Sequence, residues 1–472
     1  MTARTSRRGP TVALAALTVA AVTLSGGTAS AAPMPVPQDI NGDGYRDLVV
    51  PAPRATVNGH SFAGAVVVLY GSAKGVSATK RAVISQGSPG VPGAVEEGDL
   101  FGASSALADL DKDGYADLVA GSPGETIGSR KQAGAVTVLW GSEKGLVSGA
   151  GLPTAAPADE KQAGQDVAAW SGPDGTQVLI VHRNSTTRLT GPVSRAGAVG
   201  SAVLHDETGW MRSATFGDLN GDKAADRVLV TGRMGGYSGG LIHVNSSLMD
   251  HPPRVLQGDG LTSAVGDVNG DGYGDLVVGD PDEPDAEGPV GHVGGAVHIW
   301  FGSAKGVSYT AAPLTIHQDT AGVPGGGESH DAFGASVAVA DLNKDGLGDI
   351  VIGAPGEAVG TKQYAGAVTV VPGRATGALG AGAYGFTQNT AGVPGGAEAS
   401  DHFGSTVTAG DLNRDGRPEI AVGAGWENDE GGIWVLPGGT SQPVYASSVA
   451  FGAADLGLPP ASGMLLGGVL QQ

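Results

Sequence analysis

Six short segments of this 472-residue chain place oxygen-bearing side chains at a spacing that suits a metal ion. Each follows the pattern D-x-[DN]-x-D-x-x-x-[DE] and runs into an apolar stretch. When such a loop curls, the side chains at positions 1, 3, 5 and 9 converge, and a flexible shell of hard oxygen donors is what Ca²⁺ prefers. We therefore predict about five or six bound calcium ions. The predicted ligands are Asp39, Asn41, Asp43 and Asp47; Asp109, Asp111, Asp113 and Asp117; Asp218, Asn220, Asp222 and Asp226; Asp267, Asn269, Asp271 and Asp275; Asp341, Asn343, Asp345 and Asp349; and Asp411, Asn413, Asp415 and Glu419.

The EF-hand shares the opening of this pattern, but it requires a bidentate Glu at position 12 and a helix on each side. The residues at position 12 cannot ligate a metal: they are Val50, Ala120, Leu229, Val278, Ile352 and Val422. The segments that follow the loops, such as residues 349–353, are short β-branched runs closed by glycine, which are typical of strands. We therefore expect the loops to join β-strands.

Two other motifs accompany the loops. A Phe-Gly pair lies eight residues before the first Asp of three loops, and Gly-Ala-Pro or a variant follows the strand after three loops. The pairs are residues 101–102, 333–334 and 403–404, and the turns are residues 121–123, 279–281 and 353–355. Alternating apolar runs come next, and this alternation predicts further strands. These runs include residues 64–70, 134–140 and 295–300.

Phe-Gly, the acidic loop and Gly-Ala-Pro in this order resemble the FG-GAP repeat. The chain is similar to the N-terminal β-propeller of integrin α subunits and to related bacterial secreted proteins. The resemblance implies that each repeat is one blade and that the calcium loop is the hairpin between its first two strands. It also implies that loops on one face recognise ligands while calcium binds on the other face.

Internal repetition supports duplicated units without reference to any family. The pattern V-P-G-x-x-E-x-x-D-x-F-G begins at Val91, Val323 and Val393, all with identical internal spacing. Between the loops at Asp109 and Asp218, the gap of 109 residues is too long for one unit and fits two.

A degenerate unit fills that gap, with Ser171 and Pro173 where its loop should carry acids. We interpret it as a blade without calcium, which brings the total to seven, a common number for propellers. The predicted fold is an all-β, seven-bladed β-propeller. Its approximate blades are residues 32–98 completed by 446–472, 99–160, 161–207, 208–256, 257–330, 331–400 and 401–445.

Two of the acidic loops depart from the pattern. Lys223 replaces the Gly at position 6, where positive φ is easiest, so we expect weaker calcium binding there. Glu419 replaces Asp at position 9 and brings a longer side chain.

A Phe-Gly pair within residues 449–452 has no acidic loop after it. We expect this C-terminal segment to supply the missing strand of the first blade, because closure removes exposed sheet edges.

Residues 1–31 have the features of a secretory signal peptide: a basic start, an apolar run and the cleavage site Ala29-Ser30-Ala31. A transmembrane anchor is the alternative, but the run is short for one. The chain has no Cys, so we expect calcium to take the role that disulfides have in many secreted proteins. The net charge of −20 argues against nucleic acid and anionic membranes as partners. We expect a secreted monomer that does not insert into membranes.

One catalytic pattern occurs, at residues 236–240. Gly-Tyr-Ser-Gly-Gly matches G-x-S-x-G, which is a nucleophile elbow only between a strand and a helix. A strand-like run follows instead, so we interpret the motif as an inter-strand loop and predict no catalytic residue. The ten histidines contain no paired-His zinc motif. We expect His298 to face the surface from a strand, and His330 and His402 to lie in solvated loops.

Tryptophans complete the sequence-based interpretation. Trp140 and Trp300 occupy matching strand ends, which favours packing between blades, whereas Trp426 lies in an acidic loop. An exposed aromatic in such a loop can contact sugar or protein. We predict an extracellular, integrin-like binding or adhesion module with a protein or glycan ligand. A secreted hydrolase with an active site in the propeller loops is the alternative, and a purely structural surface protein is a third reading.

Overall fold

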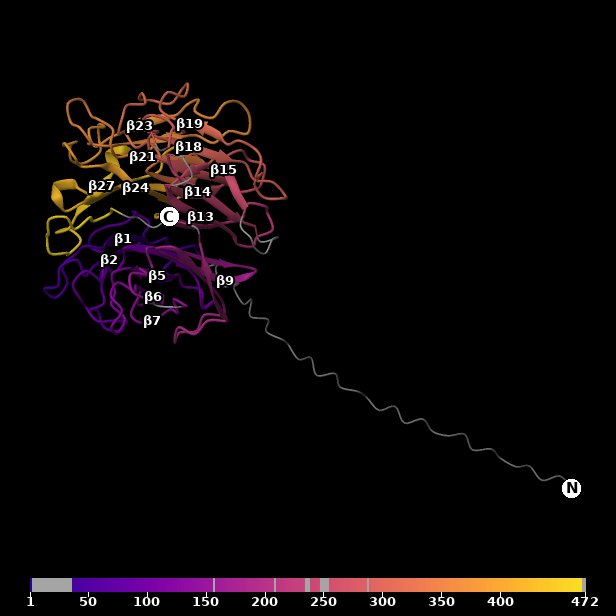
Figure 1. The fold of residues 1–472 in the computed structure, drawn as a ribbon, viewed down its shortest axis with the longest axis vertical. Coiled ribbons are helices and arrows are strands. Elements are labelled where there is room, and N and C mark those ends of the chain that lie inside the picture. Colours follow the sequence, from indigo (N-terminus) through magenta and orange to yellow (C-terminus); the bar gives the residue numbers. More distant parts are fainter. Residues whose placement is uncertain are drawn as a thin grey trace. The chain divides into compact units, whose positions relative to one another are not determined.

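The computed structural model describes Met1 and residues 36–155, 158–207, 209–233, 238–246, 254–286 and 288–468. The predicted signal peptide, Met1 apart, lies outside the described residues. Strands in the described part form seven antiparallel sheets, six with four strands and one with three. Each sheet consists of strands that are consecutive in the sequence. The chain is therefore an all-β, seven-bladed β-propeller, as the sequence predicts (Figure 1). Within the described part, no helix is long and apolar enough to cross a membrane.

Each blade is a meander whose strands follow one another in the sequence, except that blade 1 has three strands in the described part. Blade 1 comprises β1 (Leu48–Ala52), β2 (Ala65–Leu69) and β3 (Arg81–Ile84); blade 2 comprises β4 (Ser104–Ala108), β5 (Asp117–Ser122), β6 (Ala135–Leu139) and β7 (Gly149–Gly151); blade 3 comprises β8 (Asp166–Gly172), β9 (Gly175–His182), β10 (Ser185–Thr190) and β11 (Ser201–Asp206); blade 4 comprises β12 (Met211–Gly217), β13 (Asp226–Arg233), β14 (Gly240–Asn245) and β15 (Arg254–Gly260). Blade 5 comprises β16 (Thr262–Gly266), β17 (Asp275–Asp280), β18 (Ala296–Trp300) and β19 (Leu314–Ile316); blade 6 comprises β20 (Ser336–Ala340), β21 (Asp349–Ala354), β22 (Ala367–Val371) and β23 (Tyr384–Phe386); blade 7 comprises β24 (Phe403–Gly410), β25 (Glu419–Ala424), β26 (Gly432–Leu436) and β27 (Val449–Gly452). Two short 3₁₀ helices, Glu427–Asp429 and Tyr445–Ser447, lie in blade 7.

The core lies between blades, which explains why the second strand of a blade is apolar on both faces. Every residue of β5, β17 and β21 is buried, because a neighbouring blade covers each side of the sheet. The phenylalanines of the Phe-Gly pairs, Phe101, Phe333 and Phe403, are fully buried in these inter-blade clusters. The glycine that follows allows close approach: a Cβ on Gly102 would lie 2.5 Å from Val66 of the preceding blade.

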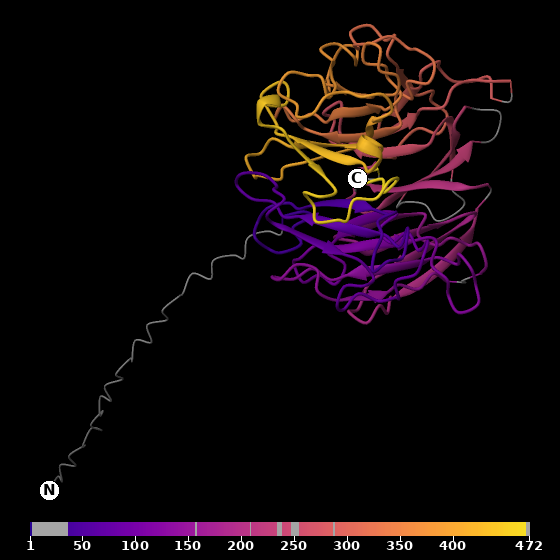
Figure 2. The same cartoon turned by 90° about the vertical axis from the view of Figure 1, so that its left-hand side faces the viewer.

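Ring closure occurs, but through a later segment than the sequence suggested. Residues 449–452 form β27, which pairs with β26 as the fourth strand of blade 7, so the expectation that they complete blade 1 was wrong. Leu466 and Gly467 take the Phe-Gly position instead. The N–H of Gly467 donates to Pro51 O of blade 1 at 3.0 Å, as Gly102 N–H does to Gly121 O at 2.9 Å in blade 2. Figure 2 shows the yellow C-terminal blade beside the indigo first blade.

Antiparallel strands send alternate loops to opposite ends of each blade. Five acidic loops join the first and second strands of their blades, and the loop at residues 39–47 leads into β1, which is equivalent to the second strand of the other blades. The acidic loops therefore share one face with the turns between third and fourth strands. We call this the acidic-loop face. Loops between second and third strands, or between β1 and β2 in blade 1, emerge on the opposite face, which we call the far face. The longer far-face loops include residues 53–64, 123–134, 281–295, 355–366 and 425–431.

Closure through Leu466 generates a first prediction. Leu466 is fully buried among residues of blades 1 and 7, so Leu466→Ala should lower the free energy of unfolding by about 2–5 kcal/mol. Its half-buried neighbour supplies the control, because Leu465→Ala removes less buried surface. Urea unfolding at fixed calcium concentration measures both. Equal, small effects would contradict a closing role for Leu466.

Candidate functional site

In all six acidic loops, the side chains predicted to bind calcium turn toward the backbone of their own loop. The carboxylate at position 1 accepts a hydrogen bond from the backbone N–H at position 6 in every loop, at 2.8–3.1 Å. The carboxylate at position 5 accepts one from the N–H at position 7, at 2.8–3.1 Å. Where position 3 is Asn, its side-chain oxygen accepts one from the N–H at position 5, at 2.8–2.9 Å. The nine-residue spacing therefore encodes one repeated loop conformation.

The acid at position 9 is buried and bound on both sides. In the acidic loop of blade 2, Asp117 accepts a hydrogen bond from Leu110 N–H at 2.8 Å and another from Gly141 N–H, just after β6, at 2.9 Å. Asp47, Asp275 and Asp349 make the matching pair of bonds in their own blades. This carboxylate joins the acidic loop to the end of the third strand.

Burial changes the ionisation of these position-9 acids. It raises the pKa of Asp47 and Asp117 to about 7 and that of Asp275 and Asp349 to about 6, against the stabilising effect of the backbone donors. Nearby acids of the same loop raise the pKa further. A cation among these carboxylates would oppose both effects.

The donor set of the loops suits a hard cation. Single oxygens of Asp109, Asp111 and Asp117 lie within 4.8 Å of one another. Asp111 Oδ1 and Asp218 Oδ1 are buried oxygens without a hydrogen-bond partner in the described part of the chain. Buried polar atoms normally find a partner, so these oxygens favour a metal ion in the loops.

A positively charged side chain of the protein also contacts the acidic loop of blade 2, which we call loop 2. Arg195, between β10 and β11 of blade 3, donates to Asp111 Oδ2 at 2.7 Å and also pairs with Asp113. Its guanidinium lies 5.9 Å from the ring centre of Trp140. This contact could not be predicted from sequence patterns, because 84 residues separate Arg195 from Asp111.

The two irregular loops keep the common conformation. Lys223 adopts φ 63° at position 6, in the region expected for glycine, and its N–H still donates to Asp218. Glu419 reaches Leu412 N–H at 2.6 Å, but its other oxygen accepts from the Asn413 side chain at 2.6 Å and not from a following strand.

Blade 3 has a tight hairpin in place of an acidic loop. Gly172 and Gly175 are paired in the ladder, so only two residues, Pro173 and Asp174, form the turn. This unit therefore forms a four-stranded blade with a two-residue turn where six other blades have an acidic loop.

Basic residues at position 4 tether neighbouring loops. In three loops this side chain donates to a backbone carbonyl of the next blade: Lys112 to Gly172 at 3.1 Å, Lys344 to Asp415 at 2.9 Å and Arg414 to Gly44 at 3.4 Å. Position 4 of the other three loops is Gly42, Gly221 or Gly270. The tethers link blade 2 to 3, blade 6 to 7 and blade 7 to 1.

The G-x-S-x-G serine does not resemble an exposed nucleophile. Gly236 and Tyr237 lie outside the described residues, but Ser238 is fully buried and precedes strand β14. Its hydroxyl donates to Asp280 at 2.8 Å and Asp259 at 3.2 Å. A nucleophile elbow needs an accessible hydroxyl at a strand-to-helix turn, so this arrangement favours the interpretation as an inter-strand contact.

Of the histidine and tryptophan residues considered in the sequence analysis, some are buried between blades and others are exposed. His298 was expected to face solvent, but its side chain is only 12% exposed, and its Nδ1 lies 2.9 Å from Thr315 Oγ1. This expectation was wrong because a neighbouring blade covers the sheet face that would otherwise be exposed. Trp140 and Trp300 are buried between blades as predicted, and Trp426 is 44% exposed on the far face.

The acidic loop of blade 6, residues 341–349, allows the acids at positions 9 and 5 to be compared in chelator, without bound metal. Asp349→Ala leaves two buried N–H groups unpaired and should cost about 2–4 kcal/mol of unfolding free energy. Asp345→Ala removes only local bonds at an exposed position and should cost less than about 1 kcal/mol. Chemical denaturation of both variants measures the difference, and equal costs would show that position 9 has no special structural role.

Comparison with known proteins agrees with this geometry. The FG-GAP repeat family matches residues 36–69, 101–139, 260–300, 333–371 and 403–436. Human phosphatidylinositol-glycan-specific phospholipase D is 30% identical over 250 residues, which is 52% of this chain and 27% of that protein. Human integrin alpha-6 is 30% identical over 181 residues (37% of this chain, 14% of that protein), and mouse integrin alpha-3 is 32% identical over 177 residues (34% and 14%). The chain thus spans less than a third of the length of these curated relatives.

Proposed function

This chain is an FG-GAP repeat protein related to the integrin α subunits and to phosphatidylinositol-glycan-specific phospholipase D, and on that premise we propose that it is a calcium-stabilised extracellular binding module. The observation that carries the proposal is the common conformation of the six acidic loops. Their inward oxygens belong to the ligand class that calcium takes. The expected export by a signal peptide would place the protein where calcium is abundant.

Calcium would act on stability, not on chemistry. Each loop gathers three or four acids, and their repulsion and desolvation oppose folding of the hairpin. An ion held by positions 1, 3, 5 and 9 would neutralise this charge. The residues present fit calcium in all six loops. We expect weaker binding in the loop of blade 4, where Lys223 replaces glycine, and competition from Arg195 in the loop of blade 2.

Removing calcium should therefore destabilise the mature protein. Extracellular calcium modules bind with Kd values of roughly 10⁻⁴–10⁻³ M. At 10 mM calcium, one site with a Kd of ~0.1 mM contributes about 2.7 kcal/mol, so several sites should produce a large rise in Tm. Thermal unfolding with calcium and with chelator, together with a count of bound ions, measures this. A Tm unaffected by chelator would overturn the calcium assignment.

Arg195 provides an internal control for the same experiment. Arg195→Gln removes the guanidinium from Asp111 and Asp113, so loop 2 should bind calcium more tightly. Arg183→Gln serves as the matched change, because Arg183 pairs with Glu160, which belongs to no acidic loop. Weaker or unchanged calcium binding by Arg195→Gln would mean that the arginine does not compete with the metal.

The far face is the better candidate for ligand contact. Phe62, Tyr364 and Trp426 are 44%, 40% and 44% exposed, and each belongs to a far-face loop. Their blades, 1, 6 and 7, are consecutive around the closed ring. Phe62 and Tyr364 occupy the same position, two residues before the glycine that ends the loop, and both have positive φ. Exposed aromatic residues of this kind are typical contact points for protein or sugar ligands.

A binding screen tests this surface. The mature protein in calcium would be applied to arrays of extracellular matrix proteins and glycans, alongside the triple variant Phe62→Ala, Tyr364→Ala, Trp426→Ala. We expect binding that the triple variant loses by at least ~10-fold, since such residues often contribute 2 kcal/mol or more each. Phe301→Ala is the control, because Phe301 is 41% exposed on the acidic-loop face. Binding unaffected by the triple change would place the ligand elsewhere.

A hydrolase remains the alternative, favoured by the similarity to a phospholipase D. That similarity covers 27% of the enzyme, and Ser238 is buried against two carboxylates, so we prefer the binding module. Turnover of ester or phosphodiester substrates that Ser238→Ala abolishes, in protein that still folds, would reverse this preference.

A further inference from the structure

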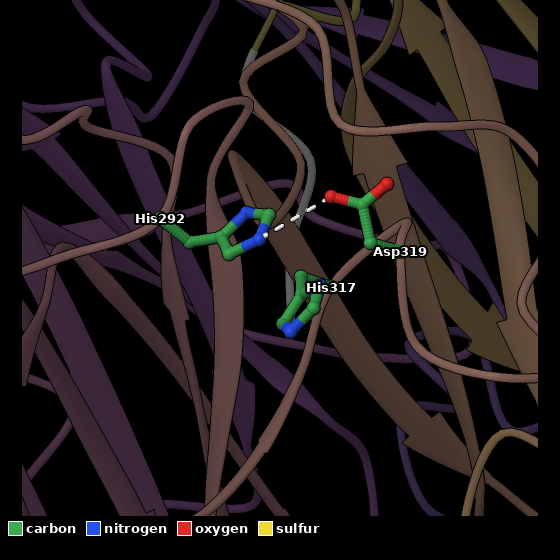
Figure 3. A group of neighbouring side chains, drawn as sticks. All are labelled: His292, His317 and Asp319. Carbon is green, nitrogen blue, oxygen red and sulfur yellow. Dashed lines mark ion pairs between the residues drawn. The ribbon is translucent and has the colours of Figure 1, made fainter.

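Blade 5 carries a cluster of potential metal ligands on the far face, away from the acidic loops. His292 lies in the far-face loop 281–295, and His317 and Asp319 follow the end of β19. Figure 3 shows the three side chains gathered together, with the carboxylate of Asp319 directed at the His292 ring. The sequence pattern did not reveal the cluster, because 25 residues separate the two histidines and no local zinc motif links them.

The distances suit a small tetrahedral ion. His292 Nε2 and Asp319 Oδ2 are 3.4 Å apart. Two ligands bound to zinc at 2.0–2.1 Å in a tetrahedron are separated by roughly 3.3 Å. One ligand atom from each of His292, His317 and Asp319 lies within 4.8 Å of the others. The imidazole rings are stacked with centres 3.7 Å apart and planes 18° apart, so we expect one ring to tilt when an ion binds.

The surroundings hold the three side chains in place and leave donor atoms free. Asp319 Oδ1 accepts a hydrogen bond from Gly327 N–H at 3.2 Å, which leaves Oδ2 for His292. The Nδ1 atoms of His292 and His317 are buried and have no hydrogen-bond partner among the described residues. Gly327 lies against the cluster, because a Cβ added there would lie 3.0 Å from both Asp319 Oδ2 and the His292 ring. Since Asp319 is 55% exposed, a fourth ligand position could be taken by water.

The repeat architecture shows that blade 6 lacks this cluster at the equivalent positions. Counted back from the glycine that ends each far-face loop, His292 corresponds to Ser61 in blade 1 and Gln363 in blade 6. Counted from the end of the fourth strand, His317 and Asp319 correspond to Thr387 and Asn389 in blade 6. Blade 5 thus has a metal-binding residue type at three positions where the next blade has neutral polar residues, and folding brings these three together.

We propose that His292, His317 and Asp319 form a zinc site on the far face. Two imidazoles and one carboxylate with an open fourth position are a ligand set typical of Zn²⁺ and differ from the all-oxygen sets that calcium takes. The site is separate from the acidic loops, so it does not depend on whether those loops bind calcium.

Equilibrium dialysis of the mature protein against Zn²⁺, with calcium in large excess, tests the proposal. The excess calcium keeps the acidic loops from contributing zinc sites. We expect one zinc ion per chain. The variant His292→Gln, His317→Thr, Asp319→Asn carries the residues of blade 6 and should preserve the fold while weakening zinc binding by at least ~10-fold, the lower range for loss of even a second-shell contact.

A matched control removes a different exposed loop histidine. His60→Gln changes the equivalent loop of blade 1 and should leave zinc binding unaltered. No zinc retained by the wild-type chain, or equal affinity in the triple variant, would overturn the proposal. Thermal unfolding in calcium confirms that the triple variant is folded, so a loss of zinc cannot be attributed to misfolding.

Discussion

One buried carboxylate in each blade that carries an acidic loop organises the rest of the repeat. The acid at position 9 accepts one backbone N–H from its own loop and, in four blades, a second from a glycine two residues beyond the end of β2, β6, β18 or β22. It therefore fixes the loop, the second strand and the third strand in a single contact. Burial makes the charged form of this acid costly, so the fold favours either a proton or a cation beside it.

Contacts between blades follow a second repeated scheme. The Phe-Gly pair fills the space between blades and brings a glycine N–H to the second strand. On the far face, Gln86, Gln318 and Gln388 donate at 2.5–2.7 Å to Glu125, Glu357 and Glu427 of the following far-face loop. Burial raises the pKa of Glu125 and Glu357 to about 7. Blades are thus joined by polar contacts at their edges as well as by apolar clusters between their faces.

The features that sequence predicted well are local. Nine contiguous residues determine each acidic loop, and a two-residue strand period determines each buried face, so both could be recognised without coordinates. Features that depend on long-range pairing were missed. Phe451-Gly452 matched the Phe-Gly letters, yet backbone pairing gives the closing role to Leu466-Gly467. His298 alternated like a surface residue, but a propeller covers both faces of its sheets. The contacts of Arg195 and the cluster at His292 join segments that are far apart in the sequence, so only the folded structure reveals them.

The tethers at position 4 give the ring a direction and divide it into arcs. Each basic side chain reaches forward to the loop of the next blade, never backward, and glycine interrupts the series at blades 1, 4 and 5. These side-chain tethers join blades 6, 7 and 1 into one continuous arc. The acidic loops of blades 4, 5 and 6 are joined instead through the backbone, because Gly274 N–H donates to Asp218 O at 3.1 Å and Gly348 N–H donates to Asp267 O at 2.6 Å. A change of shape in the loop of blade 6 would therefore be transmitted forward to blades 7 and 1 through side chains and backward to blades 5 and 4 through the backbone, so metal occupancy along this part of the ring would be collective.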